Sequence, residues 1–291
     1  MKKQIIIEDI IQSLIDYYEY GNGSPHIVFT GAIHGDEVSG VRICQRLVEY
    51  LEETPPKKGS VTVIPVCNPA AFRQMRRCNF FDDMDLNRVF PGKEDGSHSE
   101  RIADAIWKLT QNAEVIIDLH NCGFYAKSYS LAIYDENPHT RNLAELFAIP
   151  LLVQSAGTPG QLFTESCRRR GQKALIIEMP NGARPGVVNK ESTELGWESI
   201  MNVLRHEGIV AEKYIRHNVE AFGKIEDITV SENGFWTPAK KSGDSLSKGD
   251  LLGAINSREI YAEMDFFALA VNDASYVFSG DAITSYVIKN K

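Results

Sequence analysis

The stretch Ile27-Val28-Phe29-Thr30-Gly31-Ala32-Ile33-His34-Gly35-Asp36-Glu37 joins an apolar run to a histidine and, three positions later, a glutamate. An imidazole and a carboxylate at this spacing can converge on one cation where a strand gives way to a helix. Zn²⁺ favours such nitrogen and oxygen ligands in catalytic sites that keep a position open for water. Isolated His-x-x-Glu sequences also arise by chance on solvated faces, so the motif predicts a metal site only together with a further ligand.

A second apolar run, Glu114-Val115-Ile116-Ile117, leads into Asp118-Leu119-His120. Parallel strands end at the same edge of a sheet, so we expect His120 to meet His34 and Glu37 there as a third ligand. Asp118 lies two residues before His120 and shares its face of the strand, where its carboxylate can orient the imidazole. The alternative is a pair of structural histidines at strand ends. The combination with His34 and Glu37 favours a metal site.

Five motifs follow one another along the chain: Gly31-Ala32-Ile33-His34-Gly35-Asp36-Glu37, Asn68-Pro69-Ala70-Ala71-Phe72-Arg73, Asp85-Leu86-Asn87-Arg88-Val89-Phe90-Pro91-Gly92, Asp118-Leu119-His120-Asn121 and Ile177-Glu178. In these motifs and over most of its length the chain resembles the succinylglutamate desuccinylase/aspartoacylase family, a branch of the zinc carboxypeptidase-like fold. The resemblance implies one Zn²⁺ per chain held by His34, Glu37 and His120. It also implies hydrolysis of the amide bond of a small N-acyl amino acid or a related compound.

Glu178 ends the apolar run Ala174-Leu175-Ile176-Ile177 and precedes the turn-forming Met179-Pro180-Asn181-Gly182. This pattern predicts a carboxylate at a strand end. A carboxylate beside a zinc-bound water can accept its proton and later deliver it to the leaving amine. The alternative is an exposed carboxylate at the start of a turn. The position after an apolar strand and the family match favour Glu178 as the general base.

Asn87-Arg88 lies in a stretch rich in turn residues. A guanidinium and an adjacent amide can bind a carboxylate through an ion pair and a further hydrogen bond, which predicts Asn87 and Arg88 as ligands of a substrate carboxylate. In family members an arginine between the Asn-Pro and Asp-Leu-Asn-Arg motifs stabilises the oxyanion, and the resemblance implies Arg77 for this role. The register of the stretch leaves Arg76 and Arg73 open as alternatives, or as surface arginines of a long loop.

Arg168-Arg169-Arg170 is a run of charge, which most often marks a solvated face. In family members that act on acidic acyl groups, an arginine shortly before the general base binds the acyl carboxylate, and Arg168 lies ten positions before Glu178. The resemblance therefore implies Arg168 as a substrate-binding residue and an acidic acyl group. Without such a contact the expected acyl group is neutral, such as acetyl, and the sequence leaves both open.

Composition and charge exclude two classes of function. The 291 residues carry a formal net charge of −8, which argues against nucleic acid as a partner because phosphate binding needs a concentrated basic surface. No apolar run reaches the length of about 18 residues that a membrane helix requires. The five cysteines are scattered without a Cys-x-x-Cys pair, as is typical of reduced thiols, so we expect a cytoplasmic location.

Apolar strands alternate with amphipathic segments up to about residue 210. We expect strands at 26–33, 61–66, 114–120, 129–134 and 173–178, and helices at 37–53, 98–111, 139–148 and 190–207. This alternation predicts an α/β sandwich with a largely parallel central sheet. The segment 67–97 has few periodic hydrophobic residues, and a loop of that length in a compact domain is usually functional.

From about Gly223 the sequence changes to short alternating runs with Gly-Asp turns, which predicts a small all-β domain over 223–291 after a catalytic α/β domain over 1–222. The turns resemble those of the lipoyl-like half-barrel found in relatives of this family. No Met-Lys pair marks an attachment lysine, so no covalent cofactor is expected. This domain either walls the active-site entrance or supports a contact in a homo-oligomer.

The sequence thus predicts a zinc-dependent amidohydrolase acting on a small N-acyl amino acid. One alternative is a zinc carboxypeptidase that cleaves peptides. The other is a zinc-dependent binding protein without catalytic activity on the same scaffold. The presence of Glu178 and Arg88 together with all three metal ligands favours the enzyme.

Overall fold

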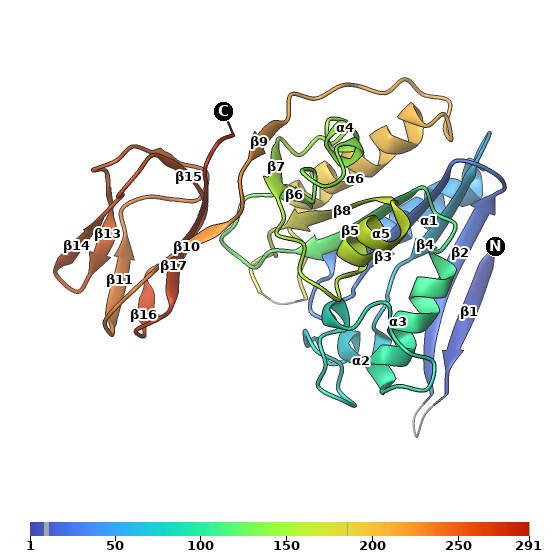
Figure 1. Cartoon of the computed structure of the whole chain (residues 1–291), viewed down its shortest axis with the longest axis horizontal. Helices are drawn as coiled ribbons and strands as arrows, with labels where there is room; N and C mark the ends of the chain where they lie inside the picture. The colour runs from blue at the N-terminus through green and yellow to red at the C-terminus, as the bar shows by residue number, and fades with distance from the viewer. Residues whose placement is uncertain (9–11, 185, 291) are drawn as a thin grey trace.

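A larger lobe built on one long sheet stands beside a smaller lobe of strands (Figure 1). The computed structural model describes residues 1–8, 12–184 and 186–290. The main sheet runs in the order β1-β2-β4-β3-β5-β8-β6-β7-β9. Its strands are β1 (Lys2–Ile7), β2 (Ser13–Gly21), β3 (His26–Gly31), β4 (Ser60–Ile64), β5 (Val115–Asn121), β6 (Tyr129–Ala132), β7 (Leu151–Gln154), β8 (Lys173–Met179) and β9 (Glu220–Phe222).

Helices cover both faces of this sheet. The first face packs against α1 (Ser39–Glu53), α4 (His139–Ala144) and α6 (Lys190–His206). The second packs against α3 (His98–Leu109) and α5 (Leu162–Arg170). The short α2 (Pro69–Phe72) and the 3-10 turn η1 (Leu86–Arg88) lie in the long connection between β4 and α3. Within the described residues, no helix is long and apolar enough to cross a membrane.

The start of α1 shows how the fold fixes the region around Glu37. Ile43, Leu47 and Leu51 recur every four residues and are fully buried, which gives the helix its apolar stripe. The Asn121 side chain accepts a hydrogen bond from the Ser39 N–H at 3.2 Å, satisfying one of the unpaired donors at the helix start. The Asn121 backbone N–H in turn donates to Glu37 at 3.0 Å, so that β5 holds the carboxylate in place.

Three neighbouring strands carry the candidate site. β3, β5 and β8 are mutually parallel, and their carboxyl ends therefore meet at one edge of the sheet. Along β5, Ile117 and Leu119 face the α1 and α6 side, whereas Ile116 faces the α3 and α5 side. By this alternation Asp118 and His120 point toward the α3 and α5 side.

The predicted α/β class with a largely parallel central sheet is confirmed, and every predicted strand and helix is present with ends shifted by a few residues. The antiparallel pairs are β1–β2, β2–β4 and β8–β6. The sequence pattern did not predict β1, β2, β7, β9, the short α2 or α5. β1 is an edge strand and β2 lies next to it, and both contain polar residues, whereas α5 is largely polar yet buried over its first two turns.

The smaller lobe consists of two antiparallel four-stranded sheets. One runs β10-β17-β15-β12 and the other β14-β13-β11-β16, around a core that includes the fully buried Trp236. The predicted C-terminal all-β unit is thus confirmed. Its strands are β10 (Glu226–Thr229), β11 (Gly234–Pro238), β12 (Ser245–Leu246), β13 (Leu251–Ile255), β14 (Arg258–Tyr261), β15 (Phe266–Val271), β16 (Ser275–Val277) and β17 (Ala282–Val287).

The two lobes are joined next to the candidate site. The Lys127 N–H, seven residues after His120, donates to the Leu269 carbonyl of β15 at 2.9 Å. One hydrophobic cluster contains Tyr129 of the main sheet as well as Leu269 of the smaller lobe. The chain passes between the lobes after Phe222. The division into domains 1–222 and 223–291 stays a prediction, because the lobes share this cluster.

Candidate metal centre

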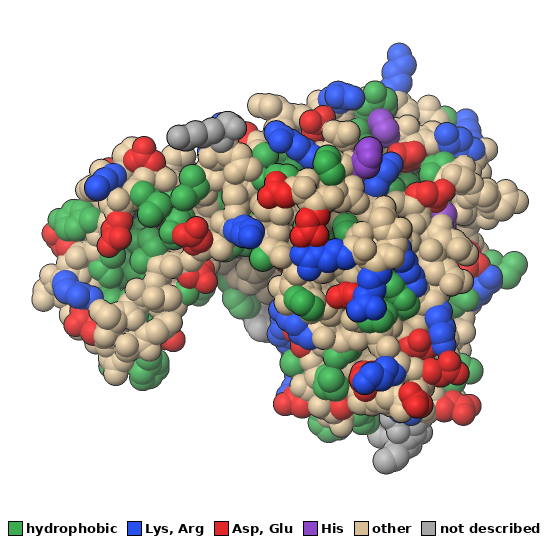
Figure 2. Space-filling view, in the orientation of Figure 1, with side chains coloured by type: hydrophobic (Ala, Val, Ile, Leu, Met, Phe, Trp, Pro, Cys, Tyr) green, Lys and Arg blue, Asp and Glu red, His purple; other side chains and the backbone are tan. Residues whose placement is uncertain are grey.

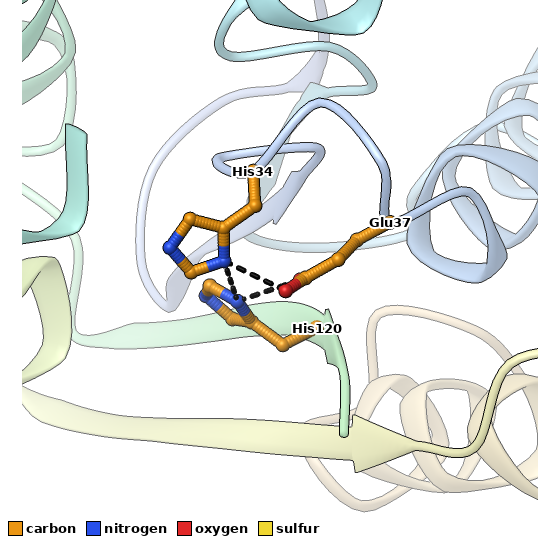
Figure 3. A group of neighbouring side chains, drawn as sticks. All are labelled: His34, Glu37 and His120. Atoms are coloured by element: carbon orange, nitrogen blue, oxygen red, sulfur yellow. Dashed lines mark hydrogen bonds and ion pairs between the residues drawn. The ribbon is translucent and has the colours of Figure 1, made fainter. Parts of the chain in front are cut away.

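Three side chains converge on one point at the carboxyl edge of the main sheet (Figure 3). His34 lies after β3, Glu37 two residues before α1, and His120 near the end of β5. Nδ1 of His34 lies 2.7 Å from Glu37 Oε1, and Nδ1 of His120 lies 2.9 Å from Glu37 Oε2. The two Nδ1 atoms are 3.2 Å apart, and all three residues are buried. The fold therefore brings the three predicted ligands together.

Each histidine is oriented by an aspartate on its outer side. His34 Nε2 lies 3.1 Å from Asp85 Oδ1, and His120 Nε2 lies 2.8 Å from Asp118 Oδ2. Because an ionised carboxylate only accepts hydrogen bonds, each Nε2 carries the proton, and in neutral rings both Nδ1 lone pairs face the centre. The two lone pairs and the Glu37 carboxylate then face one another as acceptors. A cation such as Zn²⁺ fits this donor set.

The histidines and carboxylates in and around the cluster of His34, Glu37 and His120 stabilise one another's charged forms. Burial disfavours a charged imidazole, yet Asp118 and Glu37 outweigh it and raise the pKa of His120 well above its ordinary value. Burial also disfavours the Glu37 carboxylate, but His120 and His34 hold the pKa of that carboxyl below its ordinary value. A metal ion bound here would therefore compete with protons for the same atoms of His34, Glu37 and His120.

Glu178 stands beside His120 in the sheet. The two residues are paired in register on β5 and β8, so their side chains leave the sheet on the same face. Glu178 Oε2 is buried and has no hydrogen-bond partner in the described part of the chain. Burial raises the pKa of Glu178 to about 7 against the opposing effect of His120. An unpaired carboxylate in this position is suited to accept a proton from water beside the cluster.

Of the three candidate arginines, the fold brings Arg77 to the cluster. Its guanidinium lies 3.4 Å from His34 Nδ1. Arg76 instead pairs with Asp83 at 3.0 Å on the exposed surface, and Arg73 lines a separate groove. The position of Arg77 is therefore the one that suits an oxyanion contact.

Asn87 and Arg88 lie in the 3-10 turn η1, on the same connection as Arg77. Asn87 is 2% exposed, and its Oδ1 accepts a hydrogen bond of 3.0 Å from the Leu162 N–H at the start of α5. The Arg88 side chain is 43% exposed and donates to the Asn87 carbonyl at 2.8 Å. The Arg88 guanidinium thus keeps donors for a ligand, whereas the side-chain oxygen of Asn87 is already engaged.

The fold does not bring Arg168 to the cluster. α5 ends at Arg170, just before β8 begins at Lys173, so Arg168 lies beside the opposite end of β8 from Glu178. At about 3.3 Å per residue, the strand separates these ends by about 16 Å. The Arg168 guanidinium donates to Glu136 at 2.7 Å and to a backbone carbonyl at 2.8 Å. The predicted contact of Arg168 with an acyl group has no support in this geometry.

Asp85 belongs to the site although the sequence pattern did not indicate it. One carboxylate oxygen faces His34, and the other accepts two hydrogen bonds from Arg77 at 2.9 and 3.1 Å. Burial opposes ionisation, but His34 and Arg77 lower the pKa of Asp85 below its ordinary value. The only available signal was its place at the head of the Asp85-Leu86-Asn87-Arg88 motif. Asp85 thus links His34 to Arg77.

The comparison with protein families agrees with this arrangement. A model of the succinylglutamate desuccinylase/aspartoacylase catalytic domain matches residues 24–207, which include every residue of the cluster. The chain belongs to this family. The resemblance stated from the five motifs is thereby confirmed.

Curated relatives within the family carry names of deacylating enzymes. N-alpha-acetyl-L-2,4-diaminobutyric acid deacetylase of Halomonas elongata is 30% identical over 194 residues, which cover 64% of this chain and 56% of the relative. Succinylglutamate desuccinylase of Pseudomonas fluorescens is 28% identical over 199 residues, covering 60% and 57%. The chain spans a little over half the length of these curated relatives.

Solved structures of the family share the fold over almost the whole chain. An aspartoacylase family protein from Mesorhizobium loti superposes with a TM-score of 0.84 at 24% identity, covering 100% of this chain and 95% of the other. The product-bound ectoine utilization protein from Ruegeria pomeroyi gives a TM-score of 0.81 at 22% identity, covering 95% and 89%. Both likenesses extend over the smaller lobe as well as the main sheet.

Proposed function

We propose that this chain is a zinc-dependent hydrolase that cleaves the amide bond of a small N-acyl amino acid. The observation that carries the proposal is the convergence of His34, Glu37 and His120 beside Glu178, whose buried oxygen has no partner among the described residues. A buried carboxylate oxygen without a hydrogen-bond partner costs free energy, and zinc binding alone does not require one. The names of the family relatives support the reaction class.

His34, Glu37 and His120 would hold the metal. When bound there, a zinc ion would lower the pKa of a water molecule to about 7 and would polarise a carbonyl oxygen. Glu178 accepts the proton of the attacking water on the face of the sheet that it shares with His120. The water oxygen adds to the acyl carbon, the C–N bond breaks, and Glu178 delivers the proton to the leaving nitrogen. The products are a carboxylic acid and a free amine.

Arg77 and Arg88, in the connection between β4 and α3, stabilise the oxyanion and bind the substrate carboxylate, respectively. Arg77 lies next to His34 and donates to the carbonyl oxygen as negative charge develops on it. Arg88, with its partly exposed guanidinium, binds the carboxylate of the amino acid. Asn87 holds η1 against the start of α5 and thereby positions Arg88.

The direct test combines zinc analysis with a substrate panel. We expect one equivalent of zinc per chain and chelator-sensitive release of amine from N-acyl amino acids. The panel contains N-acetyl and N-succinyl derivatives together with unblocked peptides of similar size. Zinc with cleavage of peptides alone would favour a carboxypeptidase, and zinc without any turnover would contradict the proposal.

Arg77→Ala is expected to lower kcat by about 10²–10³-fold, the usual cost of removing one oxyanion donor. Arg76→Ala is the matched control, because Arg76 is the adjacent arginine and pairs with Asp83 on the surface. Steady-state kinetics on the best substrate of the panel compare kcat of the two variants with that of the natural chain. Equal losses in both variants would show that Arg77 acts only through the folding of the loop.

Asp85→Asn is expected to weaken zinc binding by about 10–100-fold, because the negative charge behind His34 is lost. Asp83→Asn makes the same chemical change on an exposed residue of the same connection and should leave the affinity unaltered. Competition with a chromophoric chelator measures both. Unchanged affinity in Asp85→Asn would mean that the aspartate does not orient the histidine.

A further inference from the structure

An exposed apolar residue stands on a rigid segment between α6 and β9. Ile215 is 62% exposed, although its backbone is firmly held. The side chain of Asn202, itself only 2% exposed, accepts a hydrogen bond from the Ile215 N–H at 2.8 Å and donates to the Ile215 carbonyl. The buried Asn202 thus holds the backbone of Ile215 in a position that exposes the isoleucine side chain to solvent. This segment, residues 213–216, is already ordered for a contact.

Segment 213–216 has side chains and backbone amides that make no hydrogen bond or ion pair within the described chain. In an extended chain Lys213 and Ile215 point to the same side, because side chains alternate. Lys213 is exposed and has no ion pair within the described chain. The backbone amides of Tyr214 and Arg216 have no partner in the described residues either, so the segment presents two free backbone donors. The segment therefore offers an apolar side chain, a positive charge and free amides.

A groove in the smaller lobe is lined by apolar and acidic residues, which complement the exposed isoleucine and lysine of segment 213–216. β10 and β14 are the outermost strands of the two small sheets, and a groove of about 420 Å³ opens between them. Since each outermost strand has a neighbour on one side only, both walls carry unpaired backbone groups. Apolar side chains form much of the groove: Ile228, Ile260, Met264 and Phe266.

Acidic residues border this groove. Asp227, Glu259 and Glu263 line it, and none of the three has an ion pair within the part of the chain that the structure describes. The one arginine of the lining, Arg258, is paired with Glu232 at 2.7 Å. Figure 2 shows hydrophobic side chains gathered over the smaller lobe with acidic side chains around them. The groove thus suits an extended segment with an apolar side chain and an adjacent positive charge.

We propose that two copies of this chain associate by seating segment 213–216 of one copy in the β10/β14 groove of the other. Ile215 enters the apolar part of the groove, Lys213 meets its acidic border, and the free amides of the segment pair with a strand edge. The contact uses two different surfaces of the chain. In the proposed arrangement each copy places its segment in the groove of the other, and these two contacts together form a two-fold dimer.

Sedimentation velocity of the full chain over the micromolar range tests this contact. The natural chain is expected to form a dimer, and Ile215→Glu is expected to raise the dimer Kd at least about tenfold, because a charge then enters an apolar pocket. Ile6→Glu, which alters another exposed isoleucine on β1, is the matched control and should leave Kd unchanged. A natural chain that stays monomeric would overturn the proposal, as would an Ile215→Glu variant with unchanged Kd.

A charge exchange tests the identity of the groove. Lys213→Glu alone and the pair Glu259→Lys with Glu263→Lys alone should each raise Kd by about three- to tenfold, since like charges then face each other. Combining all three substitutions in one chain should restore the natural Kd at low salt. If the combined variant does not regain the natural Kd, this groove is not the binding surface. Thermal melts of each variant check that a change in Kd does not come from misfolding.

Discussion

Glu178→Gln is expected to lower kcat by about 10²–10⁴-fold while one equivalent of zinc stays bound. The glutamine keeps the shape of the side chain next to His120 but cannot accept a proton from water. Glu178 is not one of the three converging ligands, so its substitution leaves His34, Glu37 and His120 intact. The measurement pairs single-turnover kinetics with elemental analysis of the same preparation. A loss of activity at constant zinc content isolates the proton transfer from metal binding.

Glu114→Gln is the matched control for this variant. It makes the same chemical change just before the opposite end of β5, where the carboxylate accepts hydrogen bonds from Ser24 and the His26 backbone. We expect nearly natural kcat in this variant. Full activity in Glu178→Gln would show that another group accepts the proton, whereas loss of zinc would show that Glu178 acts on the metal.

The convergence of His34, Glu37 and His120 was predictable because the signal is local and periodic. Apolar runs that end in His34 and His120 indicate strands, and parallel strands place their carboxyl ends together. The orientation of His120 by Asp118 follows from the two-residue period of a strand and is present at 2.8 Å. These inferences need only the geometry of one strand and the topology of an α/β sheet.

Contacts that depend on the path of a loop were not predictable in this way. Asp85 reaches His34 across 51 residues of sequence, through a connection with little regular structure. The choice among Arg73, Arg76 and Arg77 likewise depends on turns that have no periodic pattern. The prediction for Arg168 relied on its distance in sequence from Glu178. The chain between the two residues runs along β8, so Arg168, near the end of α5, lies at the opposite end of that strand.

His120→Ala is expected to reduce bound zinc from one equivalent to almost none and to abolish turnover. The variant removes one of the three proposed ligands and leaves the buried Oδ2 of Asp118 without the imidazole that faces it, so we also expect a lower melting temperature. The natural chain should melt at a lower temperature after chelation, because zinc at a free concentration of about a thousand times Kd contributes about 4 kcal/mol. In His120→Ala the melting temperature should no longer respond to the chelator.

His26→Ala separates this effect from the general loss of a partly buried histidine. His26 begins the strand that leads to His34, but its ring bonds to Thr62 at 2.9 Å at the opposite end of the sheet. This variant should keep its zinc and should still melt earlier when the chelator is added. If His120→Ala retained zinc and a chelator-sensitive melting temperature, the cluster of His34, Glu37 and His120 would not be the metal centre, and the role assigned to Glu178 would fall with it.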